Sequence, residues 1–175
     1  MMQSKFNRIK QSYKDLHLEL LKKGKLTFRS TEKGYWGISV LDDVFELFKE
    51  INLQEHKSFI DIGSGDGRVV LAASLFTKAT GIEFDKELYN WSVQLMKELS
   101  LSGTFLNKDY FNEDLSKYDI IYSFPDKPMS RDIEPKLLKE LKGKLVVYGA
   151  HFHPAQLKKI RTLEINGTYI SIYTR

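Results

Sequence analysis

The feature that most constrains the fold is an apolar run that ends in three alternating glycines and continues into a second apolar run. It spans residues 59–73 and reads Phe-Ile-Asp-Ile-Gly-Ser-Gly-Asp-Gly-Arg-Val-Val-Leu-Ala-Ala. The first run is typical of a buried strand and the second of a buried helix. Gly63 and Gly65 permit a sharp turn between them and leave no Cβ beside a ligand. This pattern predicts an open α/β sheet with its ligand crevice beyond the carboxyl end of the strand.

Two acids mark this crevice. Asp61, at the end of the first strand, can stay ionised beside the turn and accept hydrogen bonds from it or from a cationic group of a ligand. Glu83 closes the next apolar run at about the spacing at which a βαβ unit delivers an acid to a ribose. Arg68 stands where the dinucleotide fingerprint needs glycine, and Gly67 falls one residue early. The pattern therefore favours a ribose-bearing ligand other than a dinucleotide.

The register Asp-x-Gly-x-Gly-x-Gly resembles motif I of class I S-adenosylmethionine-dependent methyltransferases. The resemblance implies S-adenosyl-L-methionine as the cofactor and a Rossmann-like α/β fold. Its mostly parallel seven-stranded sheet has the order 3-2-1-4-5-7-6 and ends in an antiparallel hairpin, with helices on both faces. The cofactor-binding residues implied are Asp61, Gly63, Ser64, Gly65, Asp66, Gly67, Glu83, Phe84, Asp109, Tyr110 and Ser123. A Rossmann-like domain whose cofactor site is unused remains the alternative.

The composition fits one catalytic domain with a basic N-terminal arm. The 175 residues suffice for a real core, and a 42% hydrophobic content argues against disorder. Cysteine is absent, which excludes thiolate metal sites and is compatible with a cytoplasmic location, and we expect no metal site. No apolar run approaches the ~20 residues that cross a bilayer. Residues 1–29 carry a net charge of +6, so the rest carries −2 and nucleic acid is not a favoured partner.

The chain divides by pattern into residues 1–38 and residues 39–175. Apolar residues at spacings of three and four predict an amphipathic helix over residues 4–23, which covers the sheet or binds a partner or membrane surface. Residues 34–37, Gly-Tyr-Trp-Gly, suit an aromatic lid. Ser39 and Asp42 predict a capping box for a helix over residues 40–51. The sequence indicates no oligomeric state.

The remaining elements follow the methyltransferase plan. We expect helices over residues 67–77, 85–101 and 135–143, and strands over residues 79–84, 104–107, 118–123 and 144–150. Asn166-Gly167 between two alternating runs predicts a type I′ hairpin. In the family, the acid after the third strand hydrogen-bonds the adenine amino group, which implies that role for Asp109, with Tyr110 flanking the ring.

The catalytic candidates follow the fourth and fifth strands. Ser123-Phe124-Pro125-Asp126 stands where the acceptor should meet the methyl group, and it departs from the Asn/Asp-Pro-Pro-aromatic pattern of adenine methyltransferases. Asp126 and His151 are therefore predicted to orient the acceptor or take its proton. A stiff turn with an exposed acid, and an ordinary loop histidine, are the competing interpretations of these two residues.

The acceptor is suggested only by resemblance. Residues 61–68 match the sequence Asp-[Leu/Ile]-Gly-Ser-Gly-Asp-Gly-Arg of a compact group of protein-lysine methyltransferases, and residues 135–143 match its layout before the fifth strand. The Phe-Pro-Asp-Lys-Pro turn is not part of that pattern. The resemblance implies a lysine amine of a protein as acceptor. RNA or small-molecule methylation, and a non-catalytic cofactor-binding scaffold, remain as alternatives.

Overall fold

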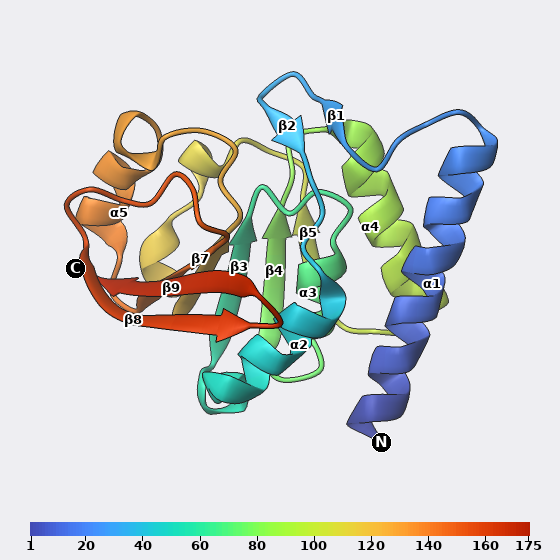
Figure 1. Ribbon diagram of the computed structural model, residues 1–175, viewed down its shortest axis with the longest axis horizontal. Coiled ribbons are helices and arrows are strands. Elements are labelled where there is room, and N and C mark those ends of the chain that lie inside the picture. The colour runs from blue at the N-terminus through green and yellow to red at the C-terminus, as the bar shows by residue number, and fades with distance from the viewer.

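The computed structural model, which describes residues 1–175, is built around one seven-stranded sheet (Figure 1). Five parallel strands are β3 (Ser58–Ile62), β4 (Lys78–Ile82), β5 (Thr104–Leu106), β6 (Ile120–Ser123) and β7 (Lys144–Tyr148). The antiparallel pair β8 (Lys158–Ile165) and β9 (Thr168–Thr174) completes the sheet in the order β5-β4-β3-β6-β7-β9-β8. Counted from β3 as the first strand, this is 3-2-1-4-5-7-6, so the predicted topology is confirmed.

The central strands alternate between two apolar layers. Phe59, Tyr122 and Val146 face the larger cluster, whereas Ile60 and Ile121 face the smaller one. The larger cluster also takes in residues of α1 (Met2–Lys22), α2 (Leu41–Glu50), α3 (Arg68–Ala73) and α4 (Lys86–Glu98), and the smaller one residues of α5 (Glu134–Glu140). Both faces of a parallel sheet are thereby covered, which explains why its strands are apolar on both sides.

The helix α1 belongs to the same core as the sheet. Phe6, Ile9 and Tyr13 are buried in the larger cluster, and the Phe6 ring stacks on Phe45 of α2 with 3.8 Å between the ring centroids. Figure 1 shows α1 alongside α4 at one edge of the molecule. None of the helices combines the length with the apolarity needed to cross a membrane. The division of the chain at residue 38 stays a prediction.

Local signals set most element ends, with one error. The Asp85 carboxylate caps α4 by accepting the N–H groups of Glu87 and Leu88, and Asn166 and Gly167 both have positive φ, as a type I′ hairpin requires. The capping box of α2 is wrong. Val40 is its N-cap and no side chain caps it, because the Ser39 hydroxyl instead hydrogen-bonds the Tyr122 hydroxyl at 2.9 Å.

Several elements are shorter than expected. The helix predicted to run to residue 77 ends at Ala73, and the strand predicted to run to residue 84 ends at Ile82. Short 3-10 helices fill the connections at Leu53–Glu55, Tyr110–Asn112, Leu115–Lys117 and Met129–Arg131. Residues 23–40 contain the two-stranded hairpin of β1 (Arg29–Ser30) and β2 (Tyr35–Trp36), which lies above the carboxyl ends of β3 and β4 in Figure 1.

Candidate active site

The glycine turn joins β3 to α3 in a conformation that ordinary residues rarely adopt. Gly63, Gly65 and Gly67 have φ values of +80°, +54° and +80°. A Cβ on Gly63 would meet no atom within 4 Å, so its side of the turn is open to a ligand. A Cβ on Gly67 would instead lie 2.6 Å from the Ser92 hydroxyl oxygen. Gly63 therefore leaves room for a ligand, whereas Gly67 lets the turn pack closely against α4.

Asp61 is a buried carboxylate without a cationic partner. Its side chain is 3% exposed and lines the cavity beside the turn. Burial, followed by the negative charges of Glu83 and Asp66, raises the pKa of Asp61 well above its ordinary value. Nothing in the protein offsets these costs with an ion pair. The geometry therefore suits a ligand that brings a positive charge or N–H donors to Asp61.

Glu83 ties the glycine turn to the second strand. One of its carboxylate oxygens accepts the N–H of Gly65 at 2.8 Å, and the other accepts the N–H of Asp85 at 2.7 Å. Burial raises the pKa of Glu83, and these two hydrogen bonds oppose the shift. Each carboxylate oxygen keeps a free lone pair, so Glu83 can still accept hydrogen bonds from hydroxyl groups in the cavity.

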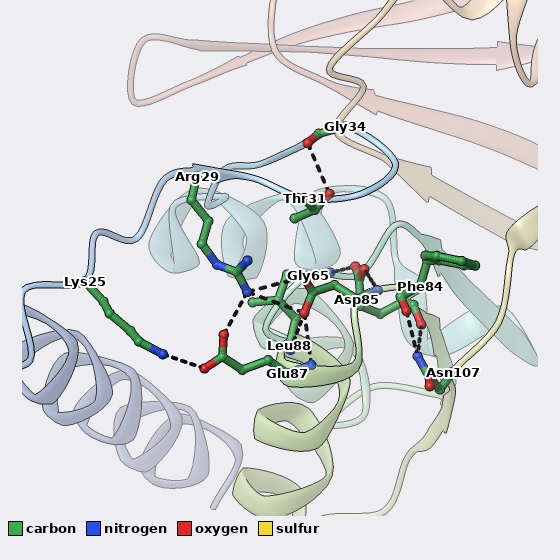
Figure 2. A network of polar contacts seen from close by, with 11 residues as sticks. Lys25, Arg29, Thr31, Gly34, Gly65, Phe84, Asp85, Glu87, Leu88 and Asn107 are labelled. Carbon is green, nitrogen blue, oxygen red and sulfur yellow. Dashed lines mark hydrogen bonds and ion pairs between the residues drawn. The ribbon is translucent and has the colours of Figure 1, made fainter.

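The β1–β2 hairpin closes over the turn. A Cβ on Gly65 would lie 2.8 Å from Cδ1 of Trp36, so the indole packs directly against the turn. On the α4 side, Arg29 Nη2 lies 3.0 Å from a Glu87 carboxylate oxygen, and Lys25 Nζ lies 2.7 Å from the other (Figure 2). The hairpin is thus anchored beside α4 and covers the cavity.

The opposite wall of the cavity comes from the segments after β5 and β6. Asp126 accepts the backbone N–H of Tyr35 at 2.5 Å, and a Cβ on Gly34 would lie only 2.0 Å from an Asp126 oxygen. The Tyr110 hydroxyl donates to Asp132 at 2.5 Å, and burial, followed by this hydrogen bond, raises the pKa of Tyr110. The hairpin therefore reaches across the cavity to the segment after β6.

Most of the predicted site residues line this one cavity. Those that do are Asp61, Gly63, Ser64, Gly65, Asp66, Glu83, Phe84, Tyr110, Ser123 and Asp126. Three others do not: Gly67, Asp109 and His151. Asp109 accepts the N–H of Phe111 at 3.0 Å and lies 3.3 Å from Lys33 Nζ, while His151 is exposed in the loop after β7. The roles predicted for these three remain untested.

The structure also shows polar contacts that the pattern did not suggest. The Asp66 carboxylate forms a buried ion pair with Arg68 at 2.6 Å, and its backbone carbonyl accepts the Tyr13 hydroxyl at 2.8 Å. The Arg68 guanidinium lies over the Tyr13 ring, 4.8 Å from its centroid. This cluster, Tyr13–Asp66–Arg68, fixes the turn to α1. The only available signal was a charged pair two residues apart in an otherwise apolar stretch.

The donor set of the cavity fits an S-adenosylmethionine-type ligand. Asp61 offers an unpartnered carboxylate for a cation, Glu83 offers acceptors for ribose hydroxyls, and Phe84 and Tyr110 offer apolar surfaces for a base. The Ser64 hydroxyl is buried without a hydrogen-bond partner. The glycine turn leaves backbone space that a side chain would fill.

Comparison with curated proteins gives two related sequences. The chain is 34% identical over 89 residues to a lysine N-methyltransferase of Caenorhabditis elegans that is named for ATP synthase, covering 49% of this chain and 47% of that protein. The chain thus spans about half the length of this relative. It is 25% identical over 118 residues to a protein-lysine N-methyltransferase of Saccharolobus islandicus, covering 62% of this chain and 73% of that protein.

Solved structures and family models agree on the fold. An RNA methyltransferase from Salinibacter ruber in complex with S-adenosyl-L-homocysteine superimposes with a TM-score of 0.69 at 21% identity, covering 79% of this chain and 93% of that one. At this identity the likeness shows the shared fold alone. The family model of the ANTKMT methyltransferase domain matches residues 61–161. Because this match spans more than half of the chain and includes the glycine turn, Glu83 and Asp126, the protein belongs to the ANTKMT methyltransferase domain family.

Proposed function

We propose that this protein is an S-adenosylmethionine-dependent methyltransferase whose acceptor is a lysine amine in a protein. The observation that carries the cofactor assignment is Asp61, a buried carboxylate that every neighbouring charge disfavours and that faces the cavity at the glycine turn. Family membership and the two lysine methyltransferase relatives support the acceptor. S-adenosylmethionine supplies a sulfonium-activated methyl group when it is bound.

The cavity residues have distinct proposed tasks. Asp61 holds the cationic amino group of the cofactor, Glu83 the ribose hydroxyls, and Phe84 and Tyr110 flank the base. Gly63, Ser64 and Gly65 form the floor of this cofactor site, and Ser123 borders its acceptor end. Asp66 lines the cavity with its carboxylate held by Arg68, so its contribution is to shape the turn. Asp109 and Gly67 support the site from outside the cavity.

Positioning supplies most of the acceleration in this proposal. Well-oriented reactants gain about 7 to 11 kcal/mol relative to a bimolecular encounter. A lysine acceptor must first lose the proton that its ordinary pKa near ~10.4 retains. Asp126 is the carboxylate at the acceptor end of the cavity, and its oxygens can take this proton while the amine nitrogen forms its new bond to the methyl carbon. His151 is exposed outside the cavity and remains a weaker candidate.

Transfer of isotope from methyl-labelled S-adenosylmethionine into a cell lysate tests the function. We expect label in material that protease releases and nuclease does not, and as methyl-lysine after hydrolysis. The Asp126→Asn variant serves as the control for enzyme-dependent label. Label lost only to nuclease would contradict the lysine assignment and favour RNA. Intact cofactor binding without any label would favour a scaffold.

Cofactor affinity should depend on pH through Asp61 and Glu83. Their raised pKa values mean that the ligand-free protein takes up protons on these groups above pH 3.8 to 4.5, their ordinary values. Affinity for the cationic cofactor should therefore fall as pH falls through the raised values, and binding there should release protons. The same groups stabilise the ligand-free fold at low pH and lose that contribution as pH rises. Calorimetry in two buffers of different ionisation enthalpy measures the released protons; equal heats would contradict the assignment.

The cytoplasm is the location we propose, since a chain without cysteine is compatible with a reducing compartment.

A further inference from the structure

The exposed phenylalanines gather at one edge of the protein. Of the 11 phenylalanines in the chain, five are exposed: Phe28, Phe84, Phe111, Phe124 and Phe152. Four of them follow the carboxyl ends of successive parallel strands, β4, β5, β6 and β7, and Phe28 immediately precedes β1 of the covering hairpin. This is the same edge at which the cavity opens (Figure 1). Exposed apolar side chains scattered singly need no explanation, but a set confined to the mouth of a site does.

Three aromatic side chains form a cluster at the acceptor end of the cavity. Phe28 stacks on Tyr35 with 5.8 Å between ring centroids. A Cβ on Gly37 would lie 4.0 Å from the Phe28 ring and 3.9 Å from the Phe124 ring, so Gly37 lies between them. Phe28, Tyr35 and Phe124 are 62%, 59% and 45% exposed. Tyr35 also donates its backbone N–H to Asp126, which places the cluster beside the proposed proton acceptor.

The cations at this edge are already neutralised by acids of the same protein. Lys33 lies 3.3 Å from Asp109, and Lys127 lies 3.3 Å from Asp132. Arg29 pairs with Glu87. An edge that carries exposed rings and internally paired charges offers little attraction to a phosphate-rich surface such as RNA or an anionic bilayer. It matches an occupant that is apolar and uncharged next to the reacting group.

We propose that the cluster of Phe28, Tyr35 and Phe124 docks an apolar segment of the acceptor protein, with uncharged apolar side chains on either side of the lysine. This inference rests on the proposed function, because the lysine is the group that reaches Asp126. The aromatic rings would bury the flanking side chains, while the cavity admits the lysine between them. Selectivity would then come from the residues that neighbour the lysine, since apolar burial contributes most of the docking energy.

Binding of short fluorescent peptides to the full chain with S-adenosylhomocysteine tests the docking surface. One peptide has leucines on both sides of a central lysine and the other has serines, and each has a version with norleucine in place of lysine. We expect the leucine peptides to bind at least about tenfold more tightly than the serine peptides, since a buried leucine contributes more than the free energy of one tenfold step. Phe28→Ser and Phe124→Ser should remove most of this preference.

Two variants serve as controls for these substitutions. Ile160→Ser removes a side chain of similar exposure, 47%, from β8 at the edge of the sheet, and should leave the preference intact. Phe28→Leu keeps an apolar side chain and should restore most of it. Equal binding of the leucine and serine peptides, or an equal loss in Ile160→Ser, would overturn the proposal. So would binding to phosphatidylcholine vesicles with no binding to either peptide.

The proposed function can fail separately. Norleucine peptides report docking without any methyl transfer. A leucine preference among them, together with no labelling of the lysine peptides, would retain the docking surface and reject the lysine acceptor. Equal labelling of both lysine peptides would retain the acceptor and reject the docking surface.

Discussion

The Asp61→Asn variant should bind S-adenosylmethionine about 10- to 100-fold more weakly, and its ligand-free form should unfold at a higher temperature than the parent protein. A hydrogen bond to a charged group contributes about 1.5 to 3 kcal/mol, which gives the loss of affinity. The gain in stability has the opposite sign because burial, Glu83 and Asp66 all oppose a negative charge at this position. A neutral amide of the same shape removes that cost.

Calorimetric titration and thermal unfolding at pH 7 measure the two effects. Asp42→Asn is the matched control, because it removes the same charge from an exposed side chain that pairs with Lys10 outside the cavity. It should leave affinity unchanged. If Asp61→Asn kept the parental affinity, Asp61 would not hold the cofactor. If it lost affinity and stability together, the loss would reflect a damaged turn rather than a missing contact.

Arg68→Leu should destabilise the protein by about 3 to 5 kcal/mol, the cost of leaving a buried charge without its partner. Asp66 is 1% exposed, and Arg68 supplies its ion pair through two guanidinium nitrogens. The double variant Asp66→Asn, Arg68→Leu should recover part of the loss, because no buried charge is then left unpaired. Urea unfolding of the two single variants and the double variant gives the coupling energy.

Arg161→Leu provides the comparison for this prediction. Arg161 pairs with Glu50 on the surface, where both side chains are about half exposed. Exposed pairs contribute about 0 to 1 kcal/mol, so this change should be small. A similar effect of Arg68→Leu and Arg161→Leu would show that the Tyr13–Asp66–Arg68 cluster is not a structural unit of the turn.

Sequence patterns predicted the parts of the fold that depend on short-range chemistry. The apolar runs, the glycine turn, the Asp85 cap and Asn166-Gly167 are each readable within a few residues, and with the family resemblance they gave the strand order. The contacts that place the β1–β2 hairpin depend on partners up to 91 residues away, such as Tyr35 and Asp126. A pattern of spacing contains no information on such a contact.

Site residues were predictable to the extent that they lie at strand ends. Asp61, Glu83, Ser123 and Asp126 lie at or just after strand ends that meet at one edge, and all four line the cavity. The same reasoning suggested His151, which follows β7 but lies in a loop that carries it away from the cavity. Ser39 was misread as a helix cap because its true partner, Tyr122, lies 83 residues away.

The bond between Tyr13 and the carbonyl of Asp66 has a consequence for how the chain is synthesised. The two residues are 53 positions apart, so the first helix leaves the ribosome well before its polar partner exists. Until the β3 strand and its turn have followed, the apolar side of α1 has no sheet on which to pack. The earliest segment of the nascent chain should therefore acquire its final place only after the centre of the sheet has formed.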